Sequence, residues 1–459
     1  LGVLAEQDRI TDVICMDRLT AGQEPPEGLR VNELPEVLAA ARPDETLDEV
    51  IYAADEEDPA CLIYTSGTGG RPKGVLLTHK SIQANIDAAY CLLAEGGAEQ
   101  GAVFLSLLPL SHAYEHTAGL HLPVQIAAEV WYCEGRDKIS ANLAEVRPTL
   151  MTAVPRLYEV LHDRITKGVT AKGGLSAKLF TQAVSLGRKK LAGQRLGLGE
   201  AVLDRLLDRL VRQKVRQRFG GRLAYFVSGG AALNPDIGTF FLALGVNILQ
   251  GYGQTEASPL ISANRPGGIR IETVGPAVDG VEVKLDKDGE LLARGDCLMK
   301  GYWRNDMATA ETLNGGWLHT GDIAEIDSDG YITITGRKKD MIVNSGGDNI
   351  APTKVEAEYS IESEIAQIMV WGDKRPHMVA VIVPSEEVRA LDKASQQEQV
   401  VAAVRRAGKR LAGYERVRHF LFADEEFSIE NGQMTPTLKV RRHVVSAAYE
   451  HRLAGLYRN

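Results

Sequence analysis

A stretch rich in glycine and hydroxyl groups, with two cations, occupies residues Tyr64–Gly74. Backbone N–H groups, Ser and Thr hydroxyls and a lysine are groups that bind phosphate oxygens. The spacing is not that of a Walker A loop, because Lys73 is followed by Gly74 rather than by Ser or Thr. The stretch could therefore surround a phosphate group, although an exposed surface loop is the alternative for glycine and serine alone.

A second stretch, Leu249–Glu256, places an aromatic ring between two glycines and ends in Thr and Glu. Tyr252 could lie against a flat adenine base, and Thr255 could bond a phosphate oxygen. Glu256 could hold Mg²⁺, which prefers one or two carboxylates together with phosphate oxygens and water. The alternative is a tight turn with a buried tyrosine.

Three further positions could contribute to the same chemistry. Asp322 follows a glycine turn and could accept both hydroxyls of a ribose, although a turn-forming aspartate is common. Arg337 could assist at the ribose, or it could lie in an exposed charged turn. Lys439 stands in a basic tail, where a lone lysine is usually solvated.

Taken in order from residue 60 to 442, these stretches resemble the core motifs of the adenylate-forming (AMP-binding) superfamily. Three further stretches narrow the resemblance to long-chain fatty acyl-CoA synthetases: Leu108–His116, Val154–Glu159 and Thr435–Lys439. The resemblance implies ATP-dependent activation of a fatty acid to acyl-AMP, with release of pyrophosphate, followed by transfer of the acyl group to coenzyme A. ATP, Mg²⁺ and CoA are thus the implied cofactors and co-substrates.

The resemblance also assigns roles to individual residues. The implied pyrophosphate loop consists of Thr65, Ser66, Gly67, Thr68, Gly69 and Lys73. The implied adenine site consists of Gly229, Gly230, Ala231, Gln250, Gly251, Tyr252 and Gly253. Thr255 is implied at the α-phosphate, Glu256 as the Mg²⁺ ligand, and Asp322 with Arg337 as the ribose clamp. The remaining implied roles are His112 at the mouth of the acyl pocket, Lys339 as the hinge, Gly346 and Gly347 along the pantetheine path, and Lys439 as the adenylation lysine.

The elements that must position these residues alternate between apolar strands and helical stretches. Expected strands are residues 103–108, 130–133, 150–154, 223–228 and 246–250. This alternation predicts an α/β fold, with a large domain over 1–338 whose mainly parallel sheet is flanked by helices on both faces. Sites in such sheets lie at the carboxyl ends of the strands.

Two smaller units are expected to complete the chain. Hairpin signals at Asp286–Gly289 and Asp327–Gly330 predict a β-rich, barrel-like unit over about 270–335. Mixed patterns predict a small α+β domain over 339–459, which the resemblance implies is mobile.

Around the phosphate stretch, we expect a strand–loop–helix unit. The apolar residues 60–64 read as a buried strand, and Thr78 can cap a helix in which Ile82, Ile86 and Leu93 recur at helical spacing. Upstream, residues 9–16 enter a strand, and the Pro- and acid-rich residues 17–58 read as a surface linker.

Residues 156–222 form a basic helical insertion, with 16 Lys and Arg against 5 Asp and Glu, a local net charge of +11. A solvated helical face is the ordinary interpretation of such a run. The other interpretation is docking to an anionic membrane surface, where each basic residue adds about 1 kcal/mol.

The totals limit the remaining choices. The 459 residues suggest two or three domains, and the net charge of −9 argues against a dedicated nucleic-acid binder. The 5 cysteines fall in no zinc or disulfide pattern, which fits the cytoplasm. No apolar run is long enough to span a bilayer, so any membrane contact would be peripheral, at the inner face. A homodimer is a further partner hypothesis.

The sequence starts at Leu1, and we expect that most of the family's front segment is missing. Two rival functions stay open. One is adenylation of another carboxylic acid for a carrier protein, and the other is a non-catalytic, membrane-associated fragment.

Overall fold

The computed structural model describes residues 11–16, 29–42, 46, 53–65, 72–98, 100–135, 137–435 and 439–457. It divides into two compact units, Leu1–Asp55 and Glu56–Asn459. In the first, β1 (Asp12–Cys15) pairs in parallel with β2 (Arg30–Glu33), and α2 (Leu34–Ala40) follows. The expected linker over 17–58 is therefore wrong for residues 30–40, because Val31 and Asn32 find strand partners in Val13 and Ile14.

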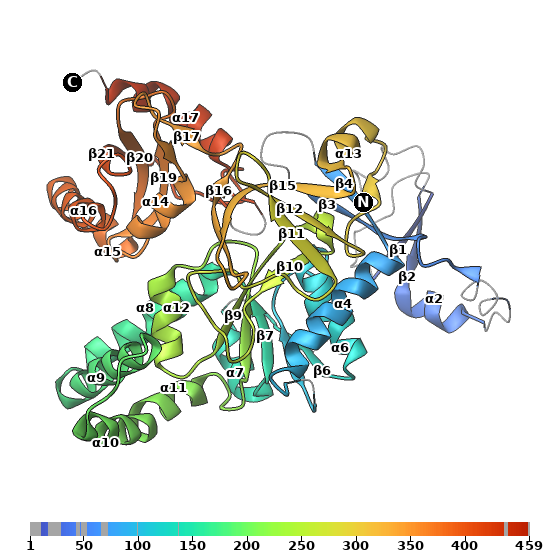
Figure 1. Cartoon of the computed structure of the whole chain (residues 1–459), viewed down its shortest axis with the longest axis horizontal. Helices are drawn as coiled ribbons and strands as arrows, with labels where there is room; N and C mark the ends of the chain where they lie inside the picture. Colours follow the sequence, from blue (N-terminus) through green and yellow to red (C-terminus); the bar gives the residue numbers. More distant parts are fainter. Residues whose placement is uncertain are drawn as a thin grey trace. The chain divides into compact units, whose positions relative to one another are not determined.

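The second unit is built around a six-stranded sheet with the order β10-β9-β8-β7-β5-β6. Four of these strands, β6, β7, β9 and β10, are labelled in Figure 1. The strands of the sheet are β5 (Val103–Ser106), β6 (Glu129–Tyr132), β7 (Leu150–Ala153), β8 (Tyr225–Ser228), β9 (Ile248–Gly253) and β10 (Leu260–Ala263). The first five in the chain are parallel to their neighbours, and β10 is antiparallel at the edge. The predicted parallel sheet and all five of its strands are confirmed.

Helices cover both faces of this sheet, as expected. Leu105 and Met151 face one core, which contains residues of α7 (Ile139–Val146), α8 (Pro155–Lys172) and α12 (Pro235–Ala243). Phe104 and Leu150 face the other core, which contains residues of α4 (His79–Ala94). Adjacent residues of one strand thus enter opposite cores, which explains why these strands read as uninterrupted apolar runs. Short helices α5 (Ala113–Glu115), η1 (His116–His121) and α6 (Leu122–Gln125) follow β5.

The described ends of the phosphate stretch belong to two paired strands, Tyr64 and Thr65 to one and Lys73 and Gly74 to the other, where we expected a strand, a loop and a helix. β3 (Pro59–Thr65) pairs antiparallel with β4 (Lys73–Thr78), and only then does Thr78 cap α4 by accepting a hydrogen bond from the Ser81 N–H at 3.1 Å. The expectation missed β4, whose apolar residues after Gly74 form the second strand. The predicted burial of the first strand is also wrong, because β3 is the edge of the sheet β13-β4-β3 and only its Ile63 is buried.

The basic insertion is a helical subdomain. It continues from α8 through α9 (Gly174–Leu191), α10 (Leu198–Leu207), the π-helix η2 (Asp208–Arg212) and α11 (Gln213–Arg218). Arg212 is buried and connects three of these pieces, since its guanidinium donates to the Ala183 and Ala243 carbonyls at 2.8 Å each and pairs with Asp204. A charge that is satisfied in this way fixes the insertion against α12.

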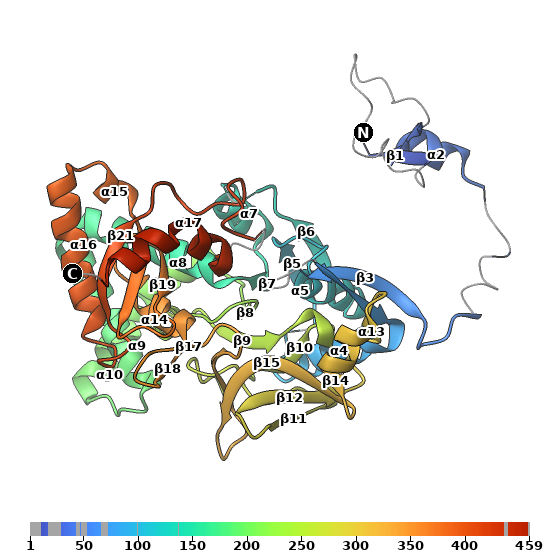
Figure 2. The ribbon, with the colours of Figure 1, turned by 90° about the horizontal axis from the view of Figure 1, so that it is seen from above.

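The β-rich unit is a curled antiparallel sheet (Figure 2). It contains β11 (Val281–Leu285), β12 (Glu290–Gly295), β14 (Leu313–Asn314), β15 (Trp317–Ile326) and β16 (Ile332–Arg337). Both predicted hairpins are confirmed, because β11 pairs with β12 and β15 pairs with β16. β13 (Gly301–Tyr302) and α13 (Asp306–Thr312) connect this sheet to β4.

The C-terminal segment has an α+β fold with its own cores. β17 (Ile342–Val343) and β18 (Asn349–Ile350) form a small hairpin before the sheet β19-β20-β21. The sheet strands are β19 (Ile365–Trp371), β20 (Met378–Pro384) and β21 (Val417–Phe422). The helices are α14 (Pro352–Tyr359), α15 (Glu386–Arg389), α16 (Lys393–Gly408) and α17 (Arg442–Gly455). None of the helices in the described ranges is long and apolar enough to cross a membrane.

Candidate nucleotide-binding site

A buried carboxylate joins the β-rich unit to the main sheet. Asp322 of β15 and Arg337 of β16 are cross-strand partners, and the Arg337 Nε donates to Asp322 Oδ1 at 2.9 Å. The Tyr252 hydroxyl, at the end of β9, donates to Asp322 Oδ2 at 2.6 Å. Each oxygen keeps a further lone pair, so the carboxylate can still accept from two hydroxyls of a ligand.

The charges of this trio are fixed by its surroundings. The Arg337 side chain is 44% exposed; its partial desolvation would lower the pKa of Arg337, but the Asp322 carboxylate outweighs this effect and raises the pKa, so the guanidinium stays charged. Burial, followed by the Asp322 charge, raises the pKa of Tyr252, so its hydroxyl remains a donor. The predicted ribose clamp and the predicted adenine-stacking tyrosine are therefore brought together by direct hydrogen bonds.

The glycine-rich ends of β8 and β9 lie side by side, because these strands are parallel neighbours. Gly229 follows β8, and a Cβ there would lie 3.1 Å from the ring of Tyr114, which leaves little room for any larger residue. A Cβ at Gly253 would lie 1.8 Å from the Pro259 carbonyl oxygen. The carboxyl ends of these two strands thus lie together, as the sequence predicts for a site at strand ends. One end carries Gly229, Gly230 and Ala231, and the other carries Gly251, Tyr252 and Gly253.

Gln250 supports this edge through its side chain. Its amide nitrogen donates to the Thr273 carbonyl at 2.9 Å and to the Ile271 carbonyl at 3.2 Å, and its oxygen accepts from the Leu233 N–H at 2.9 Å. All of these hydrogen bonds are made to other parts of the protein. Its predicted contact with a nucleotide stays a prediction.

Tyr302 connects two of the predicted motifs, and our sequence reasoning missed it. Its hydroxyl donates to Glu256 Oε1 at 2.7 Å, and the Lys73 ammonium lies 4.5 Å from the centroid of its ring. Burial and the Glu256 charge raise the pKa of Tyr302, so the hydroxyl stays protonated. The sequence around Tyr302 resembles that of any core tyrosine, and only the pairing of β13 with β4 brings it to the site.

Glu256 fits the requirements of an Mg²⁺ ligand. It lies in the 3₁₀-helix η3 (Thr255–Ala257), which is separated from the end of β9 by Gln254 alone. Within the described part of the chain, its Oε2 accepts no hydrogen bond, and Oε1 accepts one from Tyr302. A carboxylate oxygen without a donor is a ligand atom of the kind that Mg²⁺ takes in addition to phosphate oxygens.

Lys439 lies within electrostatic range of the trio. Lys439 is exposed as a residue, but desolvation of its ammonium by the surrounding protein, followed by the Arg337 charge, lowers the pKa of Lys439 against the opposing effect of Asp322. Burial and then the Lys439 charge lower the pKa of His112, whose Nδ1 accepts from the Tyr114 N–H at 3.2 Å. The structure therefore brings Lys439, His112, Arg337 and Asp322 into one neighbourhood.

The other predicted residues stay predictions. Lys339 is exposed in the turn after β16, where the N–H of Asp340 donates to the Arg337 carbonyl at 3.0 Å. Gly346 and Gly347 form a turn whose N–H groups donate to the side chain and carbonyl of Asn344. In the phosphate loop, Thr65 and Lys73 are paired residues of β3 and β4. Ser66, Gly67, Thr68 and Gly69 lie outside the described residues.

Comparison with known families identifies the class of protein. The family model described as AMP-binding enzyme matches residues 3–303, and the model described as AMP-binding enzyme C-terminal domain matches residues 339–459. The chain therefore belongs to the AMP-binding enzyme family.

Two similar proteins carry names that are more specific than the family description. The chain is 33% identical over 456 residues to a long-chain-fatty-acid–CoA ligase, FadD15, of Mycobacterium bovis, covering 93% of this chain and 74% of the relative. It is 32% identical over 437 residues to the peroxisomal long chain acyl-CoA synthetase 7 of Arabidopsis thaliana, covering 87% and 61%.

Solved structures share the fold. The adenylation domain of a carboxylate reductase from Mycobacterium chelonae matches with a TM-score of 0.68 at 23% identity, over 94% of this chain and 65% of that one. The o-succinylbenzoate CoA synthetase of Bacillus subtilis in complex with AMP matches with a TM-score of 0.64 at 19% identity, over 91% and 74%. The predicted α/β architecture with a small C-terminal domain is thus the fold of adenylate-forming enzymes.

We expect Glu256→Gln to raise the Mg²⁺ concentration that adenylation needs, with little change in thermal stability, because the substitution is nearly isosteric. Tyr302→Phe is the matched variant, since it removes only the hydroxyl that orients Glu256 and keeps the ring beside Lys73. It should shift the Mg²⁺ requirement in the same direction by less. The measurement is ATP–pyrophosphate exchange over a range of Mg²⁺ concentrations. A Glu256→Gln variant with the normal rate and Mg²⁺ requirement would exclude Glu256 as a ligand.

We expect the lowered pKa of Lys439 to appear in the pH profile of adenylation as a loss of rate at alkaline pH. The ammonium is lost as pH rises, so kcat/KM for ATP should fall at a pH below about 10.4, the ordinary lysine value. Lys439→Arg should move this alkaline limb upward, because guanidinium stays protonated. Lys287→Arg, a change at an exposed lysine of the β-rich unit, is the control and should leave the limb in place. An alkaline limb that stays in place in Lys439→Arg would assign it to another group.

Proposed function

We propose that this chain is an AMP-forming acyl-CoA ligase whose substrate is a long-chain fatty acid. The observation that carries the proposal is the convergence of two groups at one end of the main sheet. Tyr252, Asp322 and Arg337 form the first, and Lys73, Tyr302 and Glu256 form the second. The match to long-chain-fatty-acid–CoA ligases and the resemblance of Leu108–His116 support a fatty acid as substrate.

The proposed reaction has two steps. A carboxylate is a poor acyl donor, because its leaving group would be oxide. Its oxygen therefore attacks the α-phosphate of ATP, the bond to pyrophosphate breaks, and an acyl-AMP forms. The CoA thiol then attacks the acyl carbon, AMP leaves, and a thioester results. Phosphoryl chemistry of this kind needs positioning and charge stabilisation more than a protein nucleophile.

The residues divide this work among them. Asp322 and Arg337 would hold the ribose, with the ring of Tyr252 against the base. Lys439 would place its cation at the α-phosphate, and Lys73 with its loop would bind the departing pyrophosphate. Bound Mg²⁺, held by Glu256, would neutralise phosphate charge.

Two rival functions remain testable. An enzyme that loads an amino acid onto a carrier protein would need a group for the amine, and Pro109 is followed here by Leu110 rather than by an aspartate. A non-catalytic fragment would have no need to retain Glu256, Asp322 and Lys439. ATP–pyrophosphate exchange with fatty, aromatic and amino acids separates the three. Exchange only with amino acids would favour the first rival, and no exchange with any acid would favour the second.

We expect Lys439 and Lys339 to serve different half-reactions. Lys439→Ala should slow acyl-AMP formation by about 10²–10³, because it removes a charge contact made in the transition state, and should leave CoA transfer from supplied acyl-AMP nearly intact. Lys339→Pro should do the reverse, since proline fixes φ near −65° and blocks rotation at the hinge. Each half-reaction is followed separately. Equal slowing of both steps by both variants would contradict the alternation of two domain positions.

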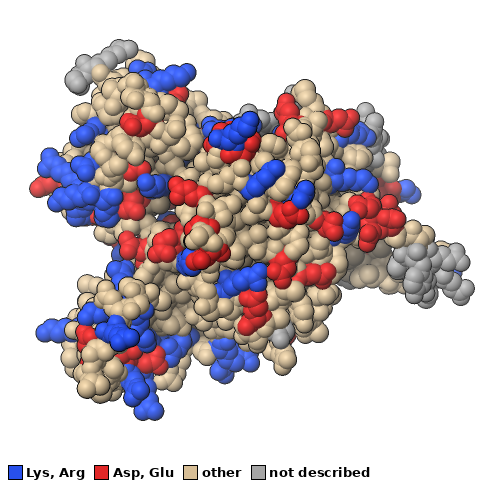
Figure 3. Space-filling view, in the orientation of Figure 1, with Lys and Arg blue, Asp and Glu red and all other residues tan. Residues whose placement is uncertain are grey.

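We also propose that the helical insertion docks on an anionic membrane surface. Leu198, Val202 and Leu206 recur every four residues on α10 and are 92%, 68% and 51% exposed, so they form an apolar stripe on the outside of the helix. Arg205 and Arg209 are exposed next to this stripe, and Figure 3 shows further Lys and Arg over α9 and α10. An apolar stripe within a basic surface is the pattern of a helix that lies in a lipid interface.

The ion pairs within the insertion show which of its charges are left to attract an anionic surface. All five acids of residues 156–222 are paired with cations inside the described structure: Glu159, Asp163, Glu200, Asp204 and Asp208. Nine cations of the same window form no ion pair with described residues: Arg164, Lys172, Lys178, Arg195, Arg205, Arg209, Lys214, Arg218 and Arg222. The acids are thus already paired within the protein, and the excess positive charge is available to a partner.

We expect the fraction of protein that sediments with vesicles of anionic lipid to fall steeply as the salt concentration rises. The reason is that the Debye screening length shortens to about 8 Å at physiological ionic strength. Arg205→Glu/Arg209→Glu should abolish binding at low salt, and Leu206→Ser should weaken it. Lys287→Glu, an exposed charge reversal in the β-rich unit, is the control that should bind nearly as the parent does. No binding at low salt, or equal loss in the control, would reject the docking face.

A further inference from the structure

A buried acidic residue beside the clamp has no role in the site described so far. Glu290, the first residue of β12, is 4% exposed. Its Oε1 accepts from the Gly321 N–H at 2.8 Å, and its Oε2 accepts from the Lys338 ammonium at 3.0 Å. Gly321 directly precedes Asp322, and Lys338 directly follows Arg337. One carboxylate therefore holds the chain neighbours of both members of the clamp.

The strand pairing explains why a carboxylate is needed there. Between β12 and β15, Glu290 pairs with Ile323 and Leu292 pairs with His319, so two steps along β12 face four along β15. The extra residues form a bulge, and bulges re-aim side chains near functional sites. Within the bulge, the Thr320 hydroxyl donates to the Leu291 carbonyl at 2.6 Å, and the Glu290 side chain takes the Gly321 N–H in place of a strand carbonyl.

A closed ring of bonds results at this bulge. The Lys338 N–H donates to the Gly321 carbonyl at 2.8 Å, while the Lys338 ammonium returns to Glu290. Gly321 has φ +71°, a conformation that favours glycine, so its carbonyl and N–H can both be used in this way. The ring fixes the backbone on each side of the Asp322–Arg337 pair.

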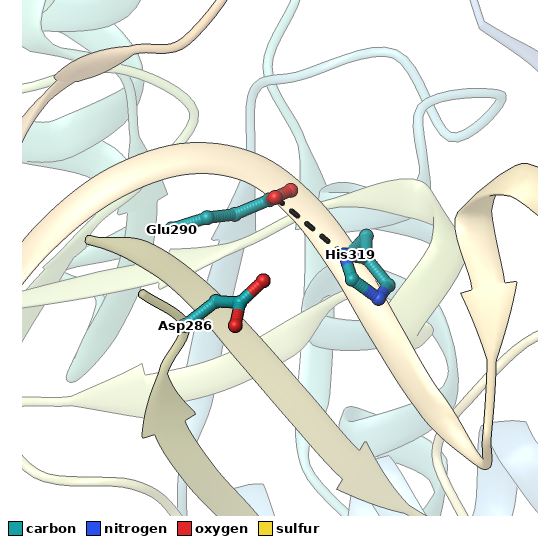
Figure 4. A group of neighbouring side chains, drawn as sticks. All are labelled: Asp286, Glu290 and His319. Carbon is teal, nitrogen blue, oxygen red and sulfur yellow. Dashed lines mark hydrogen bonds and ion pairs between the residues drawn. The ribbon is translucent and has the colours of Figure 1, made fainter. Parts of the chain in front are cut away.

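Other titratable groups face Glu290. Asp286 lies beside it, and His319 Nδ1 is 3.5 Å from Glu290 Oε2 (Figure 4). Asp288 forms an ion pair with Lys338 at the surface. The ligand atoms of Asp286, Glu290 and His319 lie within 4.8 Å of one another, but the Lys338 ammonium already supplies a cation to Glu290. We therefore interpret the group through its ion pair rather than as a metal centre.

We propose that Glu290 is a positioning residue for nucleotide binding, and that it acts by aiming Asp322 and Arg337 without touching the nucleotide. The inference rests on the proposed ribose-clamp role of Asp322. It also gives Lys338 a function, since this residue is held to the β-rich unit directly before the proposed hinge at Lys339. Nucleotide affinity should then depend on the charge at position 290, whereas binding of the acid should not.

The test compares Glu290→Gln with the parent enzyme. The amide keeps the size of the side chain and an oxygen for the Gly321 N–H, but it loses the charge that holds Lys338. We expect the Kd for AMP, measured by calorimetry, and the KM for ATP to rise roughly tenfold, as for loss of a charged hydrogen bond. The KM for the fatty acid should stay within about twofold of the parent value, since the proposed effect of Glu290 is on the ribose clamp alone.

Matched variants separate positioning from general damage. Asp288→Asn removes the exposed partner of Lys338 and should leave the Kd for AMP within about twofold of the parent value. Lys338→Met leaves Glu290 buried without its cation and should weaken AMP binding. The double variant Glu290→Gln/Lys338→Met should bind AMP no more weakly than the single Lys338→Met, because the two residues act as one pair.

Two results would overturn the proposal. The first is an unchanged Kd for AMP in both Glu290→Gln and Lys338→Met, and the second is an equal rise in the KM for ATP and for the acid. If Glu290→Gln does not fold, Lys338→Met decides alone, and normal AMP binding in it rejects the proposal. Failure of the parent enzyme to bind AMP would instead reject the proposed function, which keeps the two outcomes distinct.

Discussion

The buried carboxylate of Asp322 is the interaction on which the site depends. It accepts from the hydroxyl of Tyr252 on the main sheet and from the guanidinium of Arg337 within the β-rich unit. A buried charge is tolerated only where donors satisfy it, and here each donor comes from a different piece of the fold. The arrangement of the β-rich unit against the main sheet therefore determines whether the clamp exists, and a shift of either would leave a charge without a partner.

Other side chains support the site residues in the same way, through hydrogen bonds from distant segments. Glu290 satisfies the N–H of the bulge that aims Asp322, and Tyr302 orients Glu256 while its ring lies beside Lys73. None of these supporting side chains belongs to the motif that it supports. The site is thus assembled by contacts between segments that are far apart in the chain, and the rigid carboxyl ends of β8 and β9 provide its base.

The helical insertion uses its charges in two ways. Its acids and several cations pair within the subdomain, and the buried Arg212 joins its helices to α12. The remaining cations and the apolar stripe of α10 face outward. This combination is the basis of the proposed docking on an anionic lipid surface.

The sequence by itself determined the family and the parallel sheet and predicted the site residues, because those features are encoded locally. Apolar runs and turn residues define the strands, and the motifs around Tyr252, Asp322 and Lys439 have characteristic spacing. Sequence reasoning failed where the answer depended on partners distant in the chain. The strand that begins at Lys73 is recognisable only through its pairing with β3, and the exposure of β3 follows from its place at a sheet edge. Tyr302 and Glu290 acquire their roles only through tertiary structure, since a hydrogen bond across the fold leaves no trace in local spacing.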